Sequence, residues 1–394
     1  MGSQVAFRLA GSGSSVALLE QKTAEEQAPC CTGIVSEECL REFEIDERLV
    51  YCHCRSATLY SPSGKKIRLE RASDQAAILN RPAFNTFMAE RASRAGADYI
   101  RGARVADITI GKDKASVTAA LGTETNRYEA EAVVIATGSN STLSKEFGPG
   151  APGNVVGGAQ AEVETTGVAE VEVYFGRSVA PDLFAWLVPI SENKALAGLL
   201  TRRKPREYLS AFIKRLEEQG KITSSKGPIS SAALPLKAIS RSYAERLLVV
   251  GTAAGLVKPT TGGGIYYGLL SAEIAADTLR QALASGDMSQ RSLSFYEQRW
   301  RKKLGEELKA GSGGRAIFEH LNDKQVDRAF DIMGRPGRME SFLAEEGISF
   351  DWHSKAIADL LRQRTLAKLI NGTEIPFPGR GRAGKRPFTE GDGN

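Results

Sequence analysis

A glycine-rich segment in the second half of the chain has the composition of a binding site for an anionic group. A short apolar run at 247–250 leads into a turn at Gly251, and three glycines at 262–264 directly precede Ile265. The apolar run predicts a buried strand, and the residues from Ile265 onward predict a helix. Free N–H groups and the helix dipole attract anions to a helix N-terminus. The sequence therefore predicts an anion-binding loop here.

A second pattern that suits a nucleotide lies at the start of the chain. Residues 2–11 have helical periodicity, and the apolar run at 16–20 ends in Glu20. In a dinucleotide-binding unit, one glycine lets a helix pack closely on a strand, and an acid about 20 residues later binds ribose hydroxyls. Gly2 and Glu20 are eighteen positions apart. Only one of the three motif glycines is present, so an ordinary helix–strand pair with a surface glutamate stays open.

All five cysteines lie between Cys30 and Cys54. Cys30 is adjacent to Cys31, and Cys52 and Cys54 flank a histidine. Structural zinc sites use cysteine pairs separated by about two to four residues, so we expect no metal; inert buried cysteines are the simple alternative. A disulfide framework would be spread over a secreted fold, so the clustering favours a cytoplasmic protein.

The elements around these residues alternate between strands and helices. An apolar strand at 132–136 runs into Thr137 and Gly138, a helix is predicted at 82–95, and a β-meander at 104–131. Residues 170–200 are rich in strands, and a helix follows at 205–219. Residues 291–370 have helical periodicity, with breaks expected at the glycines of 311–314 and 334–337.

Several of these segments, at their observed spacing, resemble the geranylgeranyl reductase family of flavoproteins within the para-hydroxybenzoate-hydroxylase-like FAD group. Residues 251–265 are similar to the family's G-D-A-A-G…P-x-x-G-x-G-I segment, and residues 29–33 (PCCTG) to its P-C-x-x-G segment. Residues 181–189 (PDLFAWLVP) resemble the substrate-cavity motif P-x-x-Y-x-W-x-F-P, with Gly198 in its downstream position. The resemblance covers residues 2–370.

The resemblance implies a cofactor, a reaction and a set of site residues. FAD would be bound by Gly2, Glu20, Arg81, Ala136, Gly138, Gly251, Thr252, Gly262, Gly263, Gly264 and Ile265. The substrate would be bound by Phe184, Trp186, Leu187 and Pro189, and Cys30 is the candidate proton donor. The implied reaction is hydride transfer from reduced flavin to carbon–carbon double bonds of a polyprenyl group on a lipid, quinone or chlorophyll precursor. NAD(P)H or a ferredoxin would supply the electrons.

The implied architecture is an α/β fold with a doubly wound, Rossmann-like FAD-binding domain built from discontinuous segments. This domain would comprise residues 1–50, 76–148 and 235–288, without its first strand. A β-sheet substrate domain would comprise 51–75 and 149–234, followed by a C-terminal helical region at 289–370. The glycine-rich stretch 371–394 is expected to be a disordered tail.

The sequence departs from the family pattern at four places. The first strand and two motif glycines are absent, which suggests a mis-assigned or truncated start that lacks about 12–15 residues. Thr252 replaces an aspartate and carries no charge, Phe184 replaces a tyrosine, and Val188 replaces a phenylalanine. Phe184 and Trp186 could also be ordinary core aromatics of a strand.

Composition narrows the function classes and leaves some alternatives open. The net charge of +5 is spread over 394 residues, which does not suit a nucleic-acid binder. No apolar run reaches the roughly 18–20 residues of a membrane helix. The basic runs at 202–206 and 299–303 are expected to be solvated, with peripheral membrane contact as the alternative. A flavin monooxygenase or halogenase of the same fold, or a non-catalytic relic that binds lipid, are the other functions considered.

Overall fold

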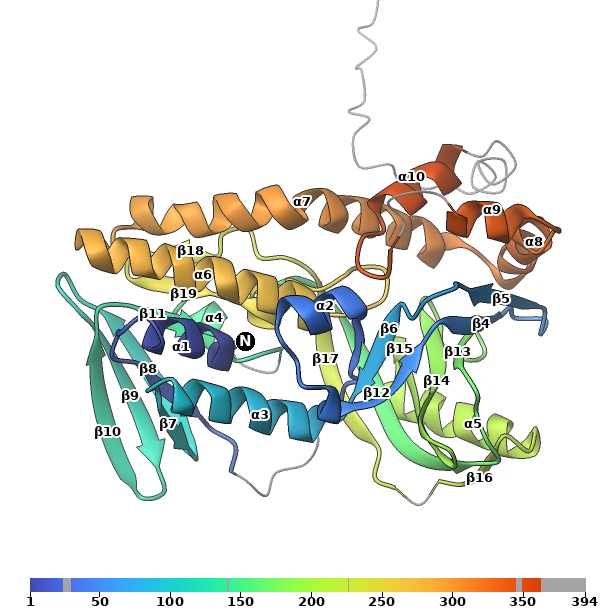
Figure 1. The fold of residues 1–394 in the computed structure, drawn as a ribbon, viewed down its shortest axis with the longest axis horizontal. Helices are drawn as coiled ribbons and strands as arrows, with labels where there is room; N and C mark the ends of the chain where they lie inside the picture. The colour runs from blue at the N-terminus through green and yellow to red at the C-terminus, as the bar shows by residue number, and fades with distance from the viewer. Residues whose placement is uncertain (24–29, 140–141, 226, 345–348, 363–394) are drawn as a thin grey trace, which may run out of the picture.

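The computed structural model describes residues 1–23, 30–139, 142–225, 227–344 and 349–362 (Figure 1). Pro29 of the PCCTG segment and the expected tail at 371–394 lie outside the described residues. The N-terminal helix α1 (Gly2–Ala10) packs beside α3 (Arg81–Arg94), and small side chains allow this close contact, among them Ala6, Ala10 and Ala92. Strand β1 (Ala17–Glu20) follows α1 and pairs in parallel with β7 (Asp98–Arg101). The predicted helices at 2–11 and 82–95 are therefore confirmed.

A second parallel pair carries the other cofactor motifs. Strand β11 (Val133–Ile135) pairs in parallel with β19 (Leu247–Val249), and β18 (Tyr243–Ala244) pairs antiparallel on the far side of β19. The short helix α4 (Leu143–Glu146) follows β11. The meander predicted at 104–131 is confirmed as β8 (Ala103–Ile110), β9 (Ala115–Leu121) and β10 (Glu124–Ala130).

The parallel strands form two separate pieces in the described part of the chain. There β1 pairs only with β7, and β11 pairs only with β19. The start of α1 lies between the two pieces, because a Cβ atom at Gly2 would be 3.2 Å from Leu18 Cδ1 and 3.3 Å from Ala136 Cβ. A continuous doubly wound sheet has one further strand at this place. The chain therefore has the α/β arrangement of a Rossmann-like fold, and its described parallel strands form two pairs with the start of α1 between them.

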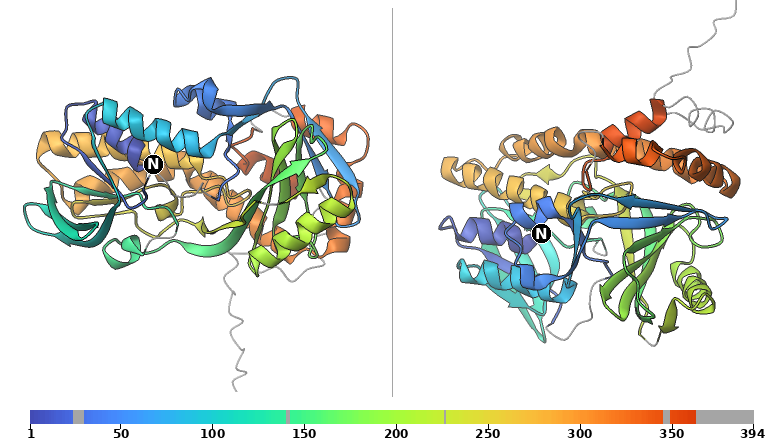
Figure 2. Two further views of the ribbon diagram at one scale, coloured as in Figure 1. Left: turned by 90° about the horizontal axis from the view of Figure 1, so that it is seen from below. Right: turned by 45° about the vertical axis from the view of Figure 1, so that its right-hand side comes forward.

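A large sheet forms the other half of the molecule (Figures 1 and 2). Its strand order is β16 (Ile222–Ser224), β12 (Gly153–Thr165), β15 (Lys194–Thr201), β14 (Phe184–Ser191), β13 (Val171–Tyr174), β4 (Ser56–Tyr60) and β5 (Lys66–Glu70), with β17 (Ser230–Lys237) also paired to β12. Helix α5 (Pro205–Glu218) covers one face with its apolar residues, including Leu209 and Phe212.

A small three-stranded sheet covers the opposite face. It contains β2 (Ile34–Ser36), β6 (Ala76–Leu79) and β3 (Val50–Cys54), with α2 (Glu37–Glu42) and the short helix η1 (Glu47–Leu49) beside it. Ile78 and Cys52 of this small sheet pack with Val188 and Ile190 of β14. Because strand side chains alternate between faces, β14 presents one set of residues to α5 and the other set to the small sheet.

Long helices line one side of the whole molecule (Figure 1). After β19 come η2 (Gly251–Ala254), α6 (Ile265–Ser285) and α7 (Gln290–His320), and α6 and α7 lie side by side. Helices α8 (Asp323–Met333), α9 (Arg338–Ala344) and α10 (Ser354–Arg362) follow. The break expected at 311–314 is wrong. Helix α7 continues through these glycines, because Gly311 and Gly314 permit close packing against Pro259 and Ile357.

Candidate functional site

The glycine-rich segment forms a tight loop at the start of α6. Two backbone hydrogen bonds close the loop, from Lys258 N to Gly263 O at 2.9 Å and from Gly262 N to Lys258 O at 2.8 Å. Gly262 has φ = 76°, a conformation that L-residues with side chains rarely adopt. A Cβ atom there would lie only 2.7 Å from Leu234 Cδ2. Packing therefore leaves no room for a side chain at position 262.

In the same loop Thr261 is exposed, and Thr260 is half-buried like the three glycines. Gly263 and Gly264 would also place a Cβ atom within 3 Å of neighbouring side chains, while residues 256–259 are buried and Gly262, Gly263 and Gly264 are half-buried. Ile265 begins α6, whose first N–H groups lack partners within the helix. The result is a partly exposed backbone surface next to a helix N-terminus, which suits the close approach of an anionic or electron-rich ligand.

Thr252 lies at the same helix start. Its Oγ1 atom would be 3.5 Å from a Cβ atom at Gly264, and the residue is half-buried in η2. Gly251, just before it, has φ = 62° and donates its N–H to Ser271 Oγ at 3.1 Å. The strand-to-turn connection predicted from the sequence is thus present. Thr252 can offer one hydroxyl to a ligand at this place, where the family pattern has a carboxylate.

The other expected cofactor residues lie at the carboxyl ends of strands or just after them. Glu20 is the last residue of β1 and accepts the Lys22 N–H at 3.0 Å, while Ala136 follows β11 next to Gly2. Gly138 has φ = 74°, and a Cβ atom there would meet nothing within 4 Å. Ligands of open α/β sheets bind at the carboxyl ends of strands. The positions of these residues suit that role, and no described contact joins Glu20 to the glycine loop.

Arg81 has buried hydrogen-bond donors that a cofactor could bind. It is the first residue of α3, its aliphatic stem packs against Gly33, and its guanidinium lies 5.1 Å from the Phe84 ring centroid. The Nε and Nη1 atoms are buried and have no hydrogen-bond partner among the described residues. Burying unpaired donors of a cation is costly. A ligand with acceptor oxygens, such as FAD, would satisfy them, so the chain's residues fit this cofactor.

Cys30 lies close to the large sheet. Its Sγ atom is 3.7 Å from the carbonyl oxygen of Ser230, the first residue of β17. Burial raises the pKa of the Cys30 thiol above its ordinary value. The group therefore carries its proton at neutral pH and can donate it.

Two aromatic side chains of β14 lie beside the glycine loop. Phe184 and Trp186 share one face of the strand, with ring centroids 5.9 Å apart, and both are half-buried. They pack in one cluster with Val257 and Leu200, and Leu200 would also contact a Cβ atom at Gly262. The buried Trp186 Nε1 has no hydrogen-bond partner in the described structure. An apolar wall is thereby placed next to the backbone surface of the loop.

Leu187 does not belong to this wall. It lies on the other face of β14, fully buried in the cluster under α5. The expectation that it lines the substrate tunnel is corrected by the alternation of side chains along a strand. Pro189 is buried, and its carbonyl oxygen accepts a hydrogen bond from Cys52 Sγ at 3.4 Å.

The histidine of the cysteine–histidine segment pairs with two carboxylates. Among the described residues, no group of three or more His, Cys, Asp or Glu side chains could hold a metal ion. His53 instead lies between Glu37 and Glu47, at 2.7 and 2.5 Å from their carboxylate oxygens. Hydrogen bonds to these carboxylates raise the pKa of His53 to about 9. The imidazole therefore acts as a cation that joins α2 to η1.

Sequence reasoning missed the residues that support the glycine loop from behind. These residues are Lys258 in the loop itself, Arg315 on α7, and Asp351 and His353 near the end of the described chain. Lys258 and Asp351 are 93 positions apart. Their residue types alone do not indicate a buried supporting role, because isolated charged residues are usually exposed.

Comparisons with known proteins agree with the resemblance seen in the sequence. A family model described as FAD-dependent oxidoreductase matches residues 62–199. Digeranylgeranylglycerophospholipid reductase 2 of Methanothermobacter thermautotrophicus is 32% identical over 341 residues, which cover 83% of this chain and 87% of the relative. The digeranylgeranylglycerophospholipid reductase of Methanocaldococcus jannaschii is 30% identical, covering 84% and 88%.

Solved structures with the same fold include reductases and oxygenases. A geranylgeranyl bacteriochlorophyll reductase-like protein from Thermoplasma acidophilum superimposes with a TM-score of 0.80 at 20% identity, covering 94% of this chain and 96% of that one. The p-nitrophenol 4-monooxygenase of Pseudomonas putida DLL-E4 gives a TM-score of 0.68 at 15% identity, covering 86% and 93%. At these identities the likeness concerns the fold alone. No helix among the described residues is long and apolar enough to cross a membrane.

Proposed function

Because the chain belongs to the geranylgeranyl reductase family of FAD-dependent oxidoreductases, we propose that it reduces carbon–carbon double bonds in the polyprenyl chains of a glycerophospholipid. The names of its relatives favour this lipid class over a quinone or a chlorophyll precursor. The observation that carries the proposal is the position of Phe184 and Trp186 beside the glycine loop. There, an apolar chain and a flat cofactor ring could meet with little water between them.

FAD, when bound, supplies hydride transfer to an alkene carbon. Gly262, Gly263 and Gly264 would hold its ring by backbone contact, and Arg81 would donate its unpartnered N–H groups to an acceptor on the cofactor. Trp186 would orient the polyprenyl chain. Gly2, Glu20, Ala136, Gly138, Gly251, Thr252 and Ile265 are proposed as further cofactor residues.

Cys30 is the proposed proton donor for the second alkene carbon. Its raised pKa keeps the thiol protonated, and the Ser230 carbonyl orients the Sγ–H group. General acid catalysis contributes about 10²–10⁴-fold. We therefore expect Cys30→Ala to slow alkene reduction by about a hundredfold or more, whereas FAD affinity stays unchanged. Unchanged reduction by Cys30→Ala would refute this role.

The electron donor and the location are also proposals. NAD(P)H bound transiently, or a ferredoxin, would reduce the flavin. We propose a cytoplasmic protein that contacts the membrane surface peripherally, since its substrate would be held in a bilayer. The basic run at 202–206, which follows β15 and enters α5, is the candidate contact surface.

The test is single-turnover reduction of a digeranylgeranylglycerophospholipid by the purified chain with chemically reduced FAD under anaerobic conditions. A mass gain of two hydrogens per reduced double bond is the expected result. A chain that binds flavin but instead consumes O₂ with NAD(P)H, leaving the alkenes intact, would be a monooxygenase. A chain that binds lipid without binding flavin would be a non-catalytic relic.

A further inference from the structure

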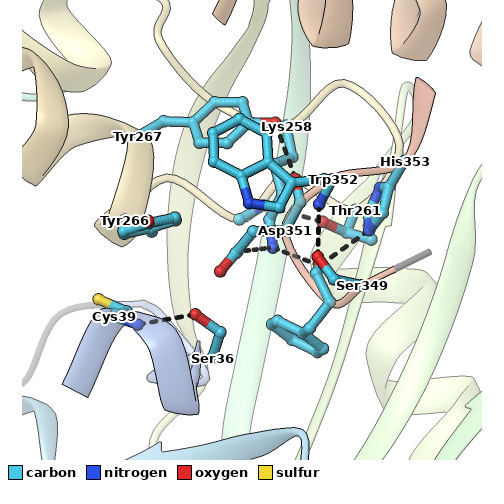
Figure 3. Close-up of polar contacts among 12 residues, drawn as sticks. Ser36, Cys39, Lys258, Thr261, Tyr266, Tyr267, Ser349, Asp351, Trp352 and His353 are labelled. Atoms are coloured by element: carbon cyan, nitrogen blue, oxygen red, sulfur yellow. Dashed lines mark hydrogen bonds and ion pairs between the residues drawn. The ribbon is translucent and has the colours of Figure 1, made fainter. Parts of the chain in front are cut away.

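The segment 349–354, near the end of the described chain, lies against the 258–263 loop (Figure 3). Lys258 Nζ donates to Asp351 Oδ1 at 2.7 Å and to the Phe350 carbonyl oxygen at 3.1 Å. His353 contacts the same loop, with Nδ1 2.7 Å from Thr260 Oγ1. Residues more than eighty positions apart in the sequence are thus joined by direct polar contacts.

The histidine contact has a defined proton arrangement. His353 Nε2 lies 2.8 Å from the Phe350 carbonyl oxygen, which can only accept, so Nε2 carries the proton. Nδ1 must then accept the hydroxyl hydrogen of Thr260. Burial lowers the pKa of His353, so the ring stays neutral at physiological pH and this arrangement persists.

Helix α7 holds the loop from a second direction. Arg315 Nε donates to the Pro259 carbonyl oxygen at 3.0 Å, and its Nη2 donates to the Thr260 carbonyl oxygen. Burial lowers the pKa of Arg315 to about 10, so the guanidinium remains a cation at neutral pH. Gly311 packs directly on Pro259, where a Cβ atom would lie 3.0 Å from Cδ.

The 349–354 segment is itself fixed to three helices. Glu307 of α7 accepts the N–H groups of His353 and Ser354 at 2.6 and 2.9 Å. Tyr267 of α6 donates its hydroxyl to the Asp351 carbonyl oxygen at 2.9 Å, and Trp352 Nε1 donates to Glu38 of α2 at 3.1 Å. These hydrogen bonds hold Asp351 in place beside Lys258.

The ion pair of Lys258 and Asp351 is almost completely removed from water. Its side chains are 6% and 1% exposed, and Asp351 Oδ2 has no hydrogen-bond partner among the described residues. Desolvation offsets the attraction of such a pair, and replacing it by apolar residues of similar volume is often neutral or stabilising. Fold stability therefore does not account for these two charges, whereas a requirement for one loop geometry would.

We propose that Lys258 and Asp351 are positioning residues that set the geometry of the glycine surface at 262–264 and thereby control FAD affinity from behind the loop. The Lys258 backbone bonds to both Gly262 and Gly263, and Lys258 Cε would be 2.7 Å from a Cβ atom at Gly263. A displaced lysine therefore moves the glycines directly. The inference rests on the proposed assignment of this loop to the flavin.

The test compares FAD binding with folding. The double variant Lys258→Met/Asp351→Asn removes both charges at similar volume, and Lys258→Arg keeps the pair. The control double variant Lys221→Met/Glu172→Gln removes a part-buried ion pair of the large sheet, whose N–O distance is 2.6 Å. For each chain, the FAD dissociation constant, the flavin midpoint potential and the thermal unfolding temperature are measured.

We expect Lys258→Met/Asp351→Asn to unfold near the parent temperature yet bind FAD about tenfold more weakly, with a shifted midpoint potential. Lys258→Arg should recover part of the affinity, and the control variant should bind FAD like the parent. A double variant with parental affinity and potential would overturn the proposal, as would one that fails to fold, since the pair would then serve stability. A parent chain that binds no FAD would instead refute the flavin assignment itself.

Discussion

Gly198 lies under the ring of Trp186, so an alanine at position 198 should displace the indole. The two residues are opposite each other on the antiparallel strands β15 and β14. A Cβ atom at 198 would be 2.5 Å from Cε2 and Cζ2 of the indole and 2.6 Å from Nε1. Ordinary carbon contacts are about 3.5 Å, so the ring must shift by roughly 1 Å.

The expected cost has a structural part and a functional part. Overpacking of this kind destabilises a fold by about 1–3 kcal/mol, because the indole is already packed against Phe184 and Val188. A misplacement of about 1 Å in a positioning group can slow catalysis by about a hundredfold. We therefore expect Gly198→Ala to fold, to bind FAD like the parent, and to lose about two orders of magnitude in alkene reduction.

The assay is single-turnover alkene reduction with chemically reduced FAD, beside FAD affinity and thermal unfolding. The control is the same substitution in a Trp186→Phe background, where the smaller ring leaves room for the new methyl group. The buried Trp186 Nε1 has no hydrogen-bond partner among the described atoms, so its loss removes no such bond. The two substitutions should therefore be strongly non-additive.

Two results would refute this reasoning. Full alkene reduction by Gly198→Ala would mean that the indole position does not matter for the substrate. Strictly additive effects of Gly198→Ala and Trp186→Phe would mean that the cost of the alanine does not pass through the ring.

Three further outcomes follow from the site and its surroundings. Gly262→Ala combines an unfavourable φ of 76° with a Cβ contact of 2.7 Å to Leu234, so FAD titration should show an affinity at least about tenfold weaker. Hydrogen bonds to Glu47 and Glu37 raise the pKa of His53 to about 9, so the stabilisation from these ion pairs is complete below about pH 6.5 and is lost as the pH rises through 9. The unfolding temperature, measured from pH 6 to 10, should therefore fall less steeply with pH in His53→Gln than in the parent. Thr252→Asp places a carboxylate at the start of α6 and should increase the free energy of unfolding of the apo chain by about 0.5 kcal/mol, measured by denaturant titration. An unchanged free energy of unfolding would mean that the side chain does not interact with the helix dipole.

Local patterns in the sequence were sufficient for most of the fold. Strand and helix periodicity located α1, α3 and the 104–131 meander, and the glycines at 262–264 marked the loop before α6. Leu187 was expected to line the substrate tunnel because it belongs to the same motif as Phe184 and Trp186. Alternate residues of a strand face opposite ways, so Leu187 lies on the other face of β14. A helix break was expected at the glycines of 311–314, but Gly311 instead lets α7 pack closely on Pro259. The sequence does not display this long-range contact.

Long-range polar contacts were beyond prediction for a physical reason. Lys258 lies before α6 and Asp351 lies after α7, so the packing of these helices brings the two side chains together. No motif relates the two positions by a fixed spacing. The same holds for Arg315, which the sequence presents as one basic residue in a charged helix. Burial reveals such residues, and burial depends on the tertiary structure that the helices create.

The distribution of charge around the loop suits an uncharged polyprenyl chain beside it. The cations Lys258 and Arg315 lie behind the loop, where Asp351 and backbone carbonyl groups bind them. The half-buried and exposed residues of the loop are threonines and glycines, and Phe184 and Trp186 beside them are half-buried; none of these carries a charge. An alkene offers no charge for an ion pair, so charges that faced it would need to remain hydrated and would keep water in the site. If the proposed assignment of the loop to the flavin holds, Lys258 and Arg315 would position the cofactor surface from behind and leave the face toward the polyprenyl chain apolar.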